Sequence, residues 1–450
     1  MAEGIRSTLV QAASWMGAEL RGADIPFEGV STDTRSMTAG GLFFALRGPN
    51  HDAHQYLAAA QAAGAVALVV EQAMPIDMPQ LIVADTRAAL ASLARAWRDS
   101  LDVAVVAITG SNGKTTVKEM CAAIFSQIAP TLSTQGNLNN EIGVPLTLLR
   151  LSPEHRYAVI EMGANHAGEI ARLVAMAAPQ VAMITNAGPA HLEGFGSIEG
   201  VAKAKGEIYG GLAEDGVAII NADDEFAPLW RQLAGGRRVI SFGAEADVSA
   251  SYQVDANGQL LLWRGLDREC AFTLPLLGEH NLRNALAASA AALALGVDST
   301  VIAKGLQGMK PVPGRLSLRK GRAGATVIDD SYNANPASLL AGLKVLSGFK
   351  GKRYLALGDM GELGGNAEAM HREAGQQALR LGVDRLYAYG PLSRAACESF
   401  GAEGQHFKEQ QQLIEAMLPV LQRDVTVLVK GSRSSRMDVV AHALSENGSN

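Results

Sequence analysis

One short segment constrains this chain more than any other, because a buried strand, a glycine-rich turn and a helix follow one another without a gap. The apolar, β-branched run Val103–Thr109 is typical of a strand that is buried on both faces. Glycines after it let successive backbone N–H groups face an anion, and the helix that begins there adds its positive end. The expected phosphate contacts are Gly110, Ser111, Asn112, Gly113, Lys114, Thr115 and Thr116.

This segment predicts a site for ATP or GTP. Lys114 can reach the β- and γ-phosphates, and the Thr115 hydroxyl can hold Mg²⁺. Ile108 stands where the general phosphate-loop pattern has its first glycine. A glycine-rich turn with a solvated lysine is the alternative, but the agreement of strand, glycines, lysine, threonine and helix favours a nucleotide site. The segment alone leaves the reaction open.

The strand pattern around this loop predicts an α/β protein with mainly parallel, doubly wound sheets, because short apolar strands alternate with helices. At roughly 100–200 residues per domain, the length of 450 suggests three domains. We expect their boundaries at 1–85, 86–313 and 314–450. Residues 194–200 are also glycine-rich, but they miss the dinucleotide-binding spacing and follow no strand, so a loop is expected there.

Composition excludes several classes of protein. Asp and Glu number 45 against 39 Lys and Arg, and a net charge of −6 argues against a nucleic-acid partner. The three cysteines, Cys121, Cys270 and Cys397, lie far apart, which argues against a disulfide framework and fits a reducing cytoplasm. The N-terminus lacks the apolar core of a signal peptide, and the apolar stretch 285–297 is too short to span a membrane.

Candidate metal ligands follow two of the expected central strands. Glu161 ends the strand 157–161, and His191 follows the strand 181–185. Doubly wound sheets bind ligands at the carboxyl ends of their strands, and Mg²⁺ at a γ-phosphate needs ligands there. A lone loop histidine is more often structural, but the phosphate loop nearby favours a metal site. On spacing alone, Lys203 and Lys205 look like solvated helix lysines.

Other candidates each have two interpretations. Asn281 and Asn284 share a helix face and could contact a base or ribose, although Asn281 could equally be an N-cap. Arg315 and Asp330 could clamp a nucleotide at a hinge between domains or form a plain salt bridge. The basic turn 430–436 could form an anion pocket or be solvated.

Taken together, these residues resemble the Mur ligases, the ATP-dependent amino-acid and peptide ligases of peptidoglycan synthesis, whose central pattern folylpolyglutamate synthases share. The similarity covers essentially the whole chain. The residues that occur in the family's order are Gly110–Thr116, Glu161, His191, Lys205, Asn284, Arg315 and Asp330. The resemblance implies an N-terminal UDP-binding domain, a central ATPase domain and a C-terminal Rossmann-like domain for the amine substrate.

The resemblance also implies ATP and Mg²⁺ as cofactors and a carbamylated lysine that bridges metal ions. The family's register favours Lys205 for this modification over its neighbour Lys203. The implied catalytic residues are Lys114, Glu161, His191 and Lys205, and the implied metal ligands are Thr115, Glu161, His191 and Lys205. Further ATP contacts would come from Asn281, Asn284, Arg315, Asp330 and Tyr332.

Four segments are most similar to the family members that join D-alanyl-D-alanine to UDP-N-acetylmuramoyl-tripeptide through an acyl phosphate. They are 31–35 with 41–48, 136–147, 356–364 and 430–433. The substrate contacts that this resemblance implies are Ser31, Thr32, Asp33, Thr34, Arg35, Arg47, Asn137, Asn139, Asn140, Asn335, Asp359, Glu362, Lys430, Ser432 and Arg433.

Two alternatives stay open. One is a sister ligase of the same fold, either another Mur ligase or folylpolyglutamate synthase. The other is a nucleotide-gated binding protein without turnover, against which the intact set of catalytic residues argues. We expect a monomer in the cytoplasm that builds cell wall, with no membrane span. The sequence leaves open whether the third residue of the tripeptide is lysine or diaminopimelate.

Overall fold

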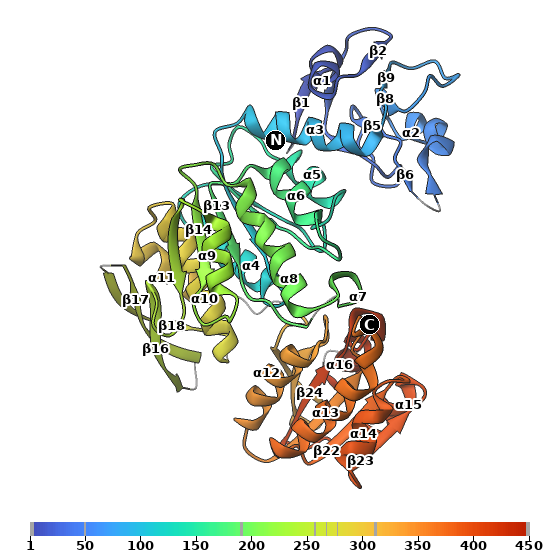
Figure 1. Cartoon of the computed structure of the whole chain (residues 1–450). Helices are drawn as coiled ribbons and strands as arrows, with labels where there is room; N and C mark the ends of the chain where they lie inside the picture. Colours follow the sequence, from blue (N-terminus) through green and yellow to red (C-terminus); the bar gives the residue numbers. More distant parts are fainter. Residues whose placement is uncertain are drawn as a thin grey trace.

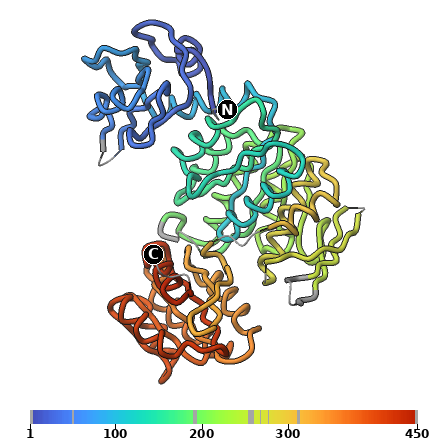
Figure 2. Tube along the Cα trace, turned by 180° about the vertical axis from the view of Figure 1, so that it is seen from behind, coloured from blue at the N-terminus to red at the C-terminus, as the bar shows by residue number. Residues whose placement is uncertain are grey.

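The computed structural model describes residues 4–48, 51–189, 192–255, 258–266, 268–276, 278–309 and 313–446. Three α/β units follow one another along the chain, with the blue N-terminal unit at one end of the central unit and the orange-to-red C-terminal unit at the other (Figure 1). The view from behind shows the same order (Figure 2). The expected α/β class with three units is therefore confirmed. No helix in the described ranges is long and apolar enough to cross a membrane.

The N-terminal unit is built on a five-stranded sheet. Its strand order is β2 (Glu19–Arg21), β9 (Gln80–Ile82), β8 (Ala67–Val70), β5 (Leu42–Phe44) and β4 (Val30–Ser31). Two antiparallel pairs flank it, β1 (Arg6–Thr8) with β3 (Pro26–Glu28) and β6 (Arg47–Gly48) with β7 (His51–Asp52). Its helices are α1 (Leu9–Met16), the 3₁₀ turn Ala53–Tyr56 and α2 (Leu57–Ala62). Helix α3 (Thr86–Asp99) then leads into the central unit, and the Asp85 carboxylate caps its N-terminus.

The central unit contains a nine-stranded sheet. Its order is β11 (Thr131–Ser133), β12 (Tyr157–Glu161), β10 (Ala104–Thr109), β13 (Val181–Ile184), β14 (Val217–Asn221), β15 (Arg238–Phe242), β16 (Val248–Asp255), β17 (Gly258–Gly265) and β18 (Arg268–Leu274). The strands from β11 to β16 run parallel, whereas β16, β17 and β18 pair antiparallel. The antiparallel extension was not predicted, although Val248–Asp255 alternates between apolar and polar residues, which is a strand signal.

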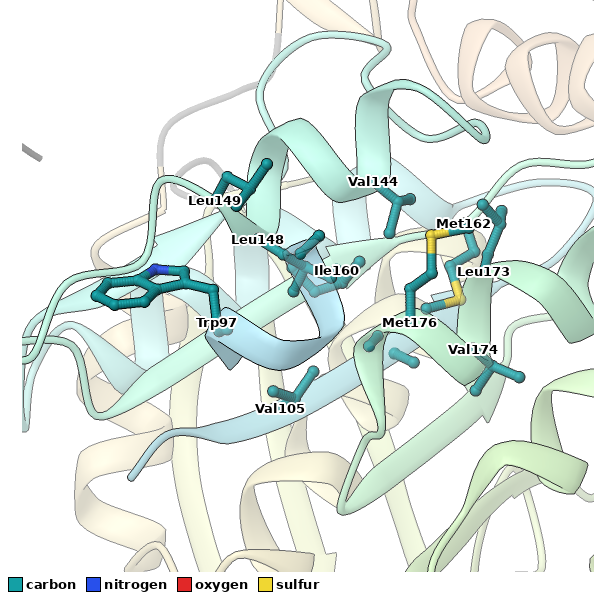
Figure 3. Close-up of a cluster of buried hydrophobic side chains, with 14 of the residues drawn as sticks. Trp97, Val105, Val144, Leu148, Leu149, Ile160, Met162, Leu173, Val174 and Met176 are labelled. Atoms are coloured by element: carbon teal, nitrogen blue, oxygen red, sulfur yellow. The ribbon is translucent and has the colours of Figure 1, made fainter. Parts of the chain in front are cut away.

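Helices cover both faces of this sheet, because successive strand residues point to opposite sides. Val105 and Ile160 pack on one face with Trp97, Leu148 and neighbours (Figure 3). That face is covered by α3, α5 (Gly143–Leu148), α6 (Glu169–Ala177) and α9 (Ala227–Ala234). The opposite face is covered by α4 (Lys114–Phe125), α10 (Glu279–Ala294) and α11 (Ser299–Gln307). The doubly wound arrangement follows from this.

The C-terminal unit has a six-stranded sheet of order β19 (Ser317–Lys320), β20 (Thr326–Asp330), β24 (Val425–Lys430), β21 (Lys352–Gly358), β22 (Arg385–Tyr389) and β23 (Gly404–Phe407). Only β19 is antiparallel to its neighbour in this sheet. One face carries α12 (Pro336–Ser347), α13 (Ala367–Arg380) and α14 (Arg394–Phe400), and the other carries α15 (Gln410–Met417) and α16 (Asp438–Leu444).

The expected loop at residues 194–200 is wrong. Helix α7 (Leu192–Phe195) ends inside this stretch and α8 (Ile198–Gly206) begins there. The Ser197 hydroxyl accepts a hydrogen bond from the Gly200 N–H at 3.0 Å and so caps α8. The glycines of this stretch favour a loop, whereas Ser197 is the residue that signals the start of a helix.

Candidate active site

A large cleft of about 1410 Å³ opens between the central and C-terminal units. It lies at the carboxyl ends of β10, β12 and β13, where parallel sheets bind ligands. The expected site residues that line it are Ser111–Thr116, Asn137, Asn139, Asn140, Glu161, Lys205, Asn281, Asn284, Arg315, Asp330, Tyr332, Asn335 and Lys430. These residues come from segments far apart in the sequence, and the fold brings them to one cleft.

The phosphate loop has the backbone that its glycines permit. Gly110 and Gly113 both have positive φ angles, 149° and 81°. A Cβ on Gly113 would come within 2.4 Å of the Asn284 side-chain oxygen, so α10 packs directly on the loop. The Lys114 ammonium donates to the Gly110 carbonyl at 2.6 Å. Burial lowers the pKa of Lys114, and the Glu161 carboxylate opposes this shift.

The Glu161 carboxylate is hydrogen-bonded directly to this loop. It is buried at the end of β12, and one of its oxygens accepts from the Thr115 hydroxyl at 2.9 Å. The other oxygen accepts from the Asn139 amide, also at 2.9 Å. A carboxylate and a hydroxyl at a phosphate loop are donors that suit Mg²⁺. Among the described residues no group of three His, Cys, Asp or Glu side chains could hold a metal.

Lys203 and Lys205 have different environments although they share α8. Lys203 is exposed and pairs with Glu199 at 2.7 Å on the outer surface. Lys205 is 2% exposed and lines the cleft. Burial, together with the charge of Lys114, lowers the pKa of Lys205 well below its usual value. A buried lysine of this kind is a neutral amine more readily than a solvated one. His191, the remaining expected metal ligand, lies outside the described residues.

Two side chains of the C-terminal unit contact the phosphate loop directly. The Arg315 guanidinium donates to the Thr115 hydroxyl at 2.9 Å and lies over the Tyr332 ring, 4.3 Å from its centroid. The Asn335 amide donates to the Asn112 side chain at 2.8 Å. Asn335 also caps α12, which fixes its orientation. These contacts hold the C-terminal unit against the nucleotide-binding loop.

Asp330 pairs with Lys430 at 2.5 Å, and both side chains are buried. Burial raises the pKa of Asp330, and the charges of Lys430 and Arg315 oppose this. Lys430 also donates to the Asn333 carbonyl at 3.0 Å. The first residue of the basic turn is therefore not solvated, whereas Arg433 in the same turn is exposed.

Several expected substrate contacts lie elsewhere. Ser31–Arg35, Arg47, Asp359, Glu362, Ser432 and Arg433 do not line the cleft, and neither does Gly110, an expected phosphate contact. In the N-terminal unit, a hydrogen bond from Arg35 lowers the pKa of Asp33 to about 2. Arg47 pairs there with Asp52 and Glu71 at 3.1 Å each. Asn281 is not an N-cap, because α10 begins two residues earlier with Gly278 as its cap.

Some cleft residues escaped the sequence analysis, notably Arg87, His280 and Lys344. Arg87 follows the capping Asp85, and Lys344 lies on α12, so neither has a spacing that separates it from an ordinary surface residue. His280 precedes Asn281, which was the available signal. Burial and the charges of Lys430 and Arg283 lower its pKa to about 4, so its ring is neutral near pH 7.

Comparison with known families matches this architecture unit by unit. The family described as Mur ligase middle domain matches residues 108–292. Those described as "Mur ligase, glutamate ligase domain" and "Mur ligase family, catalytic domain" match residues 314–433 and 26–98. The chain belongs to the Mur ligase family.

Relatives that match over the full length indicate which members of the family the chain is most similar to. The chain is 47% identical, over 99% of both chains, to UDP-N-acetylmuramoyl-tripeptide--D-alanyl-D-alanine ligase of Escherichia coli (strain K12). A crystal structure of MurF from Acinetobacter baumannii is similar at a TM-score of 0.93 and 37% identity, covering 98% of this chain and 99% of that one. A MurF ligase from Thermotoga maritima in complex with ADP is similar at a TM-score of 0.85 and 27% identity, covering 93% and 97%.

Proposed function

We infer that this protein is an ATP-dependent ligase that joins D-alanyl-D-alanine to UDP-N-acetylmuramoyl-tripeptide in peptidoglycan synthesis. The observation that carries the inference is the 47% identity to such a ligase over essentially the whole chain. The convergence of the phosphate loop, Glu161 and Lys205 in one cleft supports it. The reaction forms a C–N bond and releases ADP and phosphate.

The cleft residues supply positioning and charge for two successive steps. The γ-phosphate passes to the terminal carboxylate of the tripeptide, and the amine of the dipeptide then displaces phosphate from this acyl phosphate. The loop N–H groups and the Lys114 ammonium hold the phosphates and offset their charge. Arg315 and Asn335 draw the C-terminal unit over the loop, which excludes water from the acyl phosphate.

Mg²⁺ belongs to this proposal. Thr115 and Glu161 offer oxygen donors of the kind that it prefers, and we add His191 and a carbamylated Lys205 as further ligands. Bound there, the ion would offset phosphate charge. Asn281, Asn284, Asp330 and Tyr332, which also line the cleft, would complete the nucleotide site.

The two other substrates meet the cleft from opposite ends. Ser31–Arg35 and Arg47 of the N-terminal unit would bind the UDP part, while Asp359, Glu362 and the turn at Lys430–Arg433 would bind the dipeptide. We propose that the domain boundaries follow residues 85 and 313. We further propose that the protein is a monomer. The three free cysteines fit a location in the reducing cytoplasm.

The test of this function is amine selectivity. With ATP and UDP-N-acetylmuramoyl-tripeptide present, we expect D-alanyl-D-alanine to stimulate ADP release well above the level seen with glutamate or diaminopimelate. The assay should be run with lysine-containing and diaminopimelate-containing tripeptides. Equal stimulation by all three amines would reject the assignment and favour a sister ligase, and ATP binding without any turnover would favour a nucleotide-gated binding protein.

A second prediction concerns the terminal carboxylate of the dipeptide. The Arg433 guanidinium lies 5.6 Å from the centroid of Tyr332, a residue that lines the cleft. A charge-assisted pair with a carboxylate is worth about 1.5–3 kcal/mol, so Arg433→Ala should raise the KM for D-alanyl-D-alanine by roughly 10- to 100-fold. Arg436→Ala in the same turn is the matched comparison. A larger KM change in that variant than in Arg433→Ala would move the assignment to Arg436.

A further inference from the structure

The loop after β21, residues 359–363, carries two carboxylates to the edge of the C-terminal sheet that faces the central unit. Its first residue is tied to two other loops. The Asp359 carboxylate accepts the Ser393 N–H at 2.7 Å, and the Asp359 carbonyl accepts the Ser432 N–H at 2.8 Å. The middle of the loop depends on a different contact, which comes from α13.

His371 supplies that contact from a fully buried position on α13. Its Nδ1 lies 2.7 Å from the Ala367 carbonyl oxygen, one helical turn earlier, and a carbonyl can only accept. The Nδ1 therefore carries the proton. Its Nε2 is left as a lone-pair acceptor, and it receives the Met360 N–H at 2.9 Å. One ring thus links the first turn of α13 to the loop.

The Met360 N–H needs this acceptor. Met360 is fully buried among the apolar side chains of α13 and α14, where water does not reach the backbone. An unpaired buried N–H is costly, so removing the ring nitrogen should shift the loop rather than leave the donor unsatisfied. Burial lowers the pKa of His371, which keeps the ring neutral and Nε2 available to accept.

The loop beyond Met360 packs on the turn 430–433, whose first residue, Lys430, lines the cleft, since a Cβ on Gly361 would lie 3.6 Å from the Ser432 side chain. Glu362 has a φ of 59°, a left-handed conformation that few residues other than glycine adopt. Burial lowers the pKa of Lys114, and the carboxylates of Glu161 and Glu362 both counter this shift, so Glu362 lies within electrostatic range of the phosphate site. An uncommon backbone conformation at this place has to be held by its neighbours.

We propose that His371, as the neutral Nδ1–H tautomer, is a positioning residue for the amine substrate, because its Nε2 fixes the loop that carries Asp359 and Glu362, two of the proposed dipeptide contacts. This role rests on the proposed function, since the loop matters only if it binds the dipeptide. His371 itself is fully buried and does not line the cleft. Loss of the His371 ring should therefore change the KM for D-alanyl-D-alanine far more than the KM values for the other two substrates.

Two amide variants separate the two nitrogens of the ring. In His371→Gln the side-chain oxygen lies as many bonds from the backbone as Nε2, so it can still accept from Met360. In His371→Asn the amide reaches only the place of Nδ1. We expect His371→Asn to raise the KM for D-alanyl-D-alanine roughly tenfold or more, because a buried donor loses its partner. The KM values for ATP and UDP-N-acetylmuramoyl-tripeptide should stay within about twofold, and His371→Gln should recover most of the loss.

A stability control and a spectroscopic readout complete the test. Leu413→Ala weakens the opposite face of the same unit, so it reports what general destabilisation does to the three KM values. Equal changes in all three KM values for His371→Asn, or the same pattern in Leu413→Ala, would overturn the proposal. In ¹⁵N-histidine-labelled wild-type enzyme, His371 should show a protonated Nδ1 and an unprotonated Nε2.

The reverse tautomer in that spectrum would also overturn the proposal, whatever the enzyme assays give. A wild-type enzyme that does not use D-alanyl-D-alanine would instead refute the proposed function. The two failures are therefore distinguishable.

Discussion

Lys114→Ala should lower turnover by roughly 10²–10³ or more, because a preorganised cation at the site of developing phosphoryl charge is lost. The ammonium belongs to the first residue of α4 and donates to the Gly110 carbonyl, so it is held in place before nucleotide binds. Burial lowers its pKa, and a cation in poorly solvated surroundings attracts phosphate more strongly. The measurement is ADP release with all three substrates at saturation.

The same variant should fold. The sequence alone suggests an open surface turn, whereas the structure places the loop half-buried in the cleft. The charge that the substitution removes is a desolvated one, so its loss costs little stability. Lys203→Ala is the matched control, since this lysine lies on the outer surface and pairs with Glu199. A melting temperature close to that of the wild type and near-wild-type turnover in Lys114→Ala would reject the loop as the ATP site.

Local signals explain why much of the fold could be predicted. The strand at 157–161 occurs with the expected bounds, and those expected at 103–109 and 181–185 differ by one residue at one end, because each is an apolar run bordered by turn residues. The phosphate loop could be predicted for the same reason, since its strand, glycines and helix are contiguous. Doubly wound topology then places Glu161 beside the loop without further information.

Contacts between distant segments could not be predicted in the same way. Arg315 and Thr115 are 200 positions apart, and Asn335 and Asn112 are 223 apart. Their pairing depends on how the C-terminal unit rests on the central one, which no local pattern encodes. The pairing of Asp330 with Lys430 is a similar case, since the sequence offered Arg315, which is nearer, as the partner of Asp330. His371 gave no signal at all, because one histidine on a helix is unremarkable until its neighbours are known.

Lys205→Ala should abolish ligation while leaving ATP binding largely intact, since Lys114 and the loop remain. Two Mg²⁺ ions beside a triphosphate and a carboxylate need anionic ligands, and Glu161 is the carboxylate that accepts the Thr115 hydroxyl of the phosphate loop. A Lys205 ammonium would repel a nearby ion. A carbamate formed from CO₂ and the neutral amine turns the same side chain into a long carboxylate. The buried position and lowered pKa of Lys205 favour the neutral amine that this reaction needs.

Three measurements test this proposal beyond loss of activity. Wild-type enzyme in ¹³C-bicarbonate should show a carbamate ¹³C signal that is retained in Lys203→Ala and lost in Lys205→Ala. Added acetate or formate should partly restore Lys205→Ala by filling the vacated carboxylate position, and Lys205→Glu should remain poor because its side chain is shorter. Full activity of Lys205→Ala without added carboxylate would refute the carbamate. Density for an unmodified ammonium far from any metal in a nucleotide complex would refute it equally.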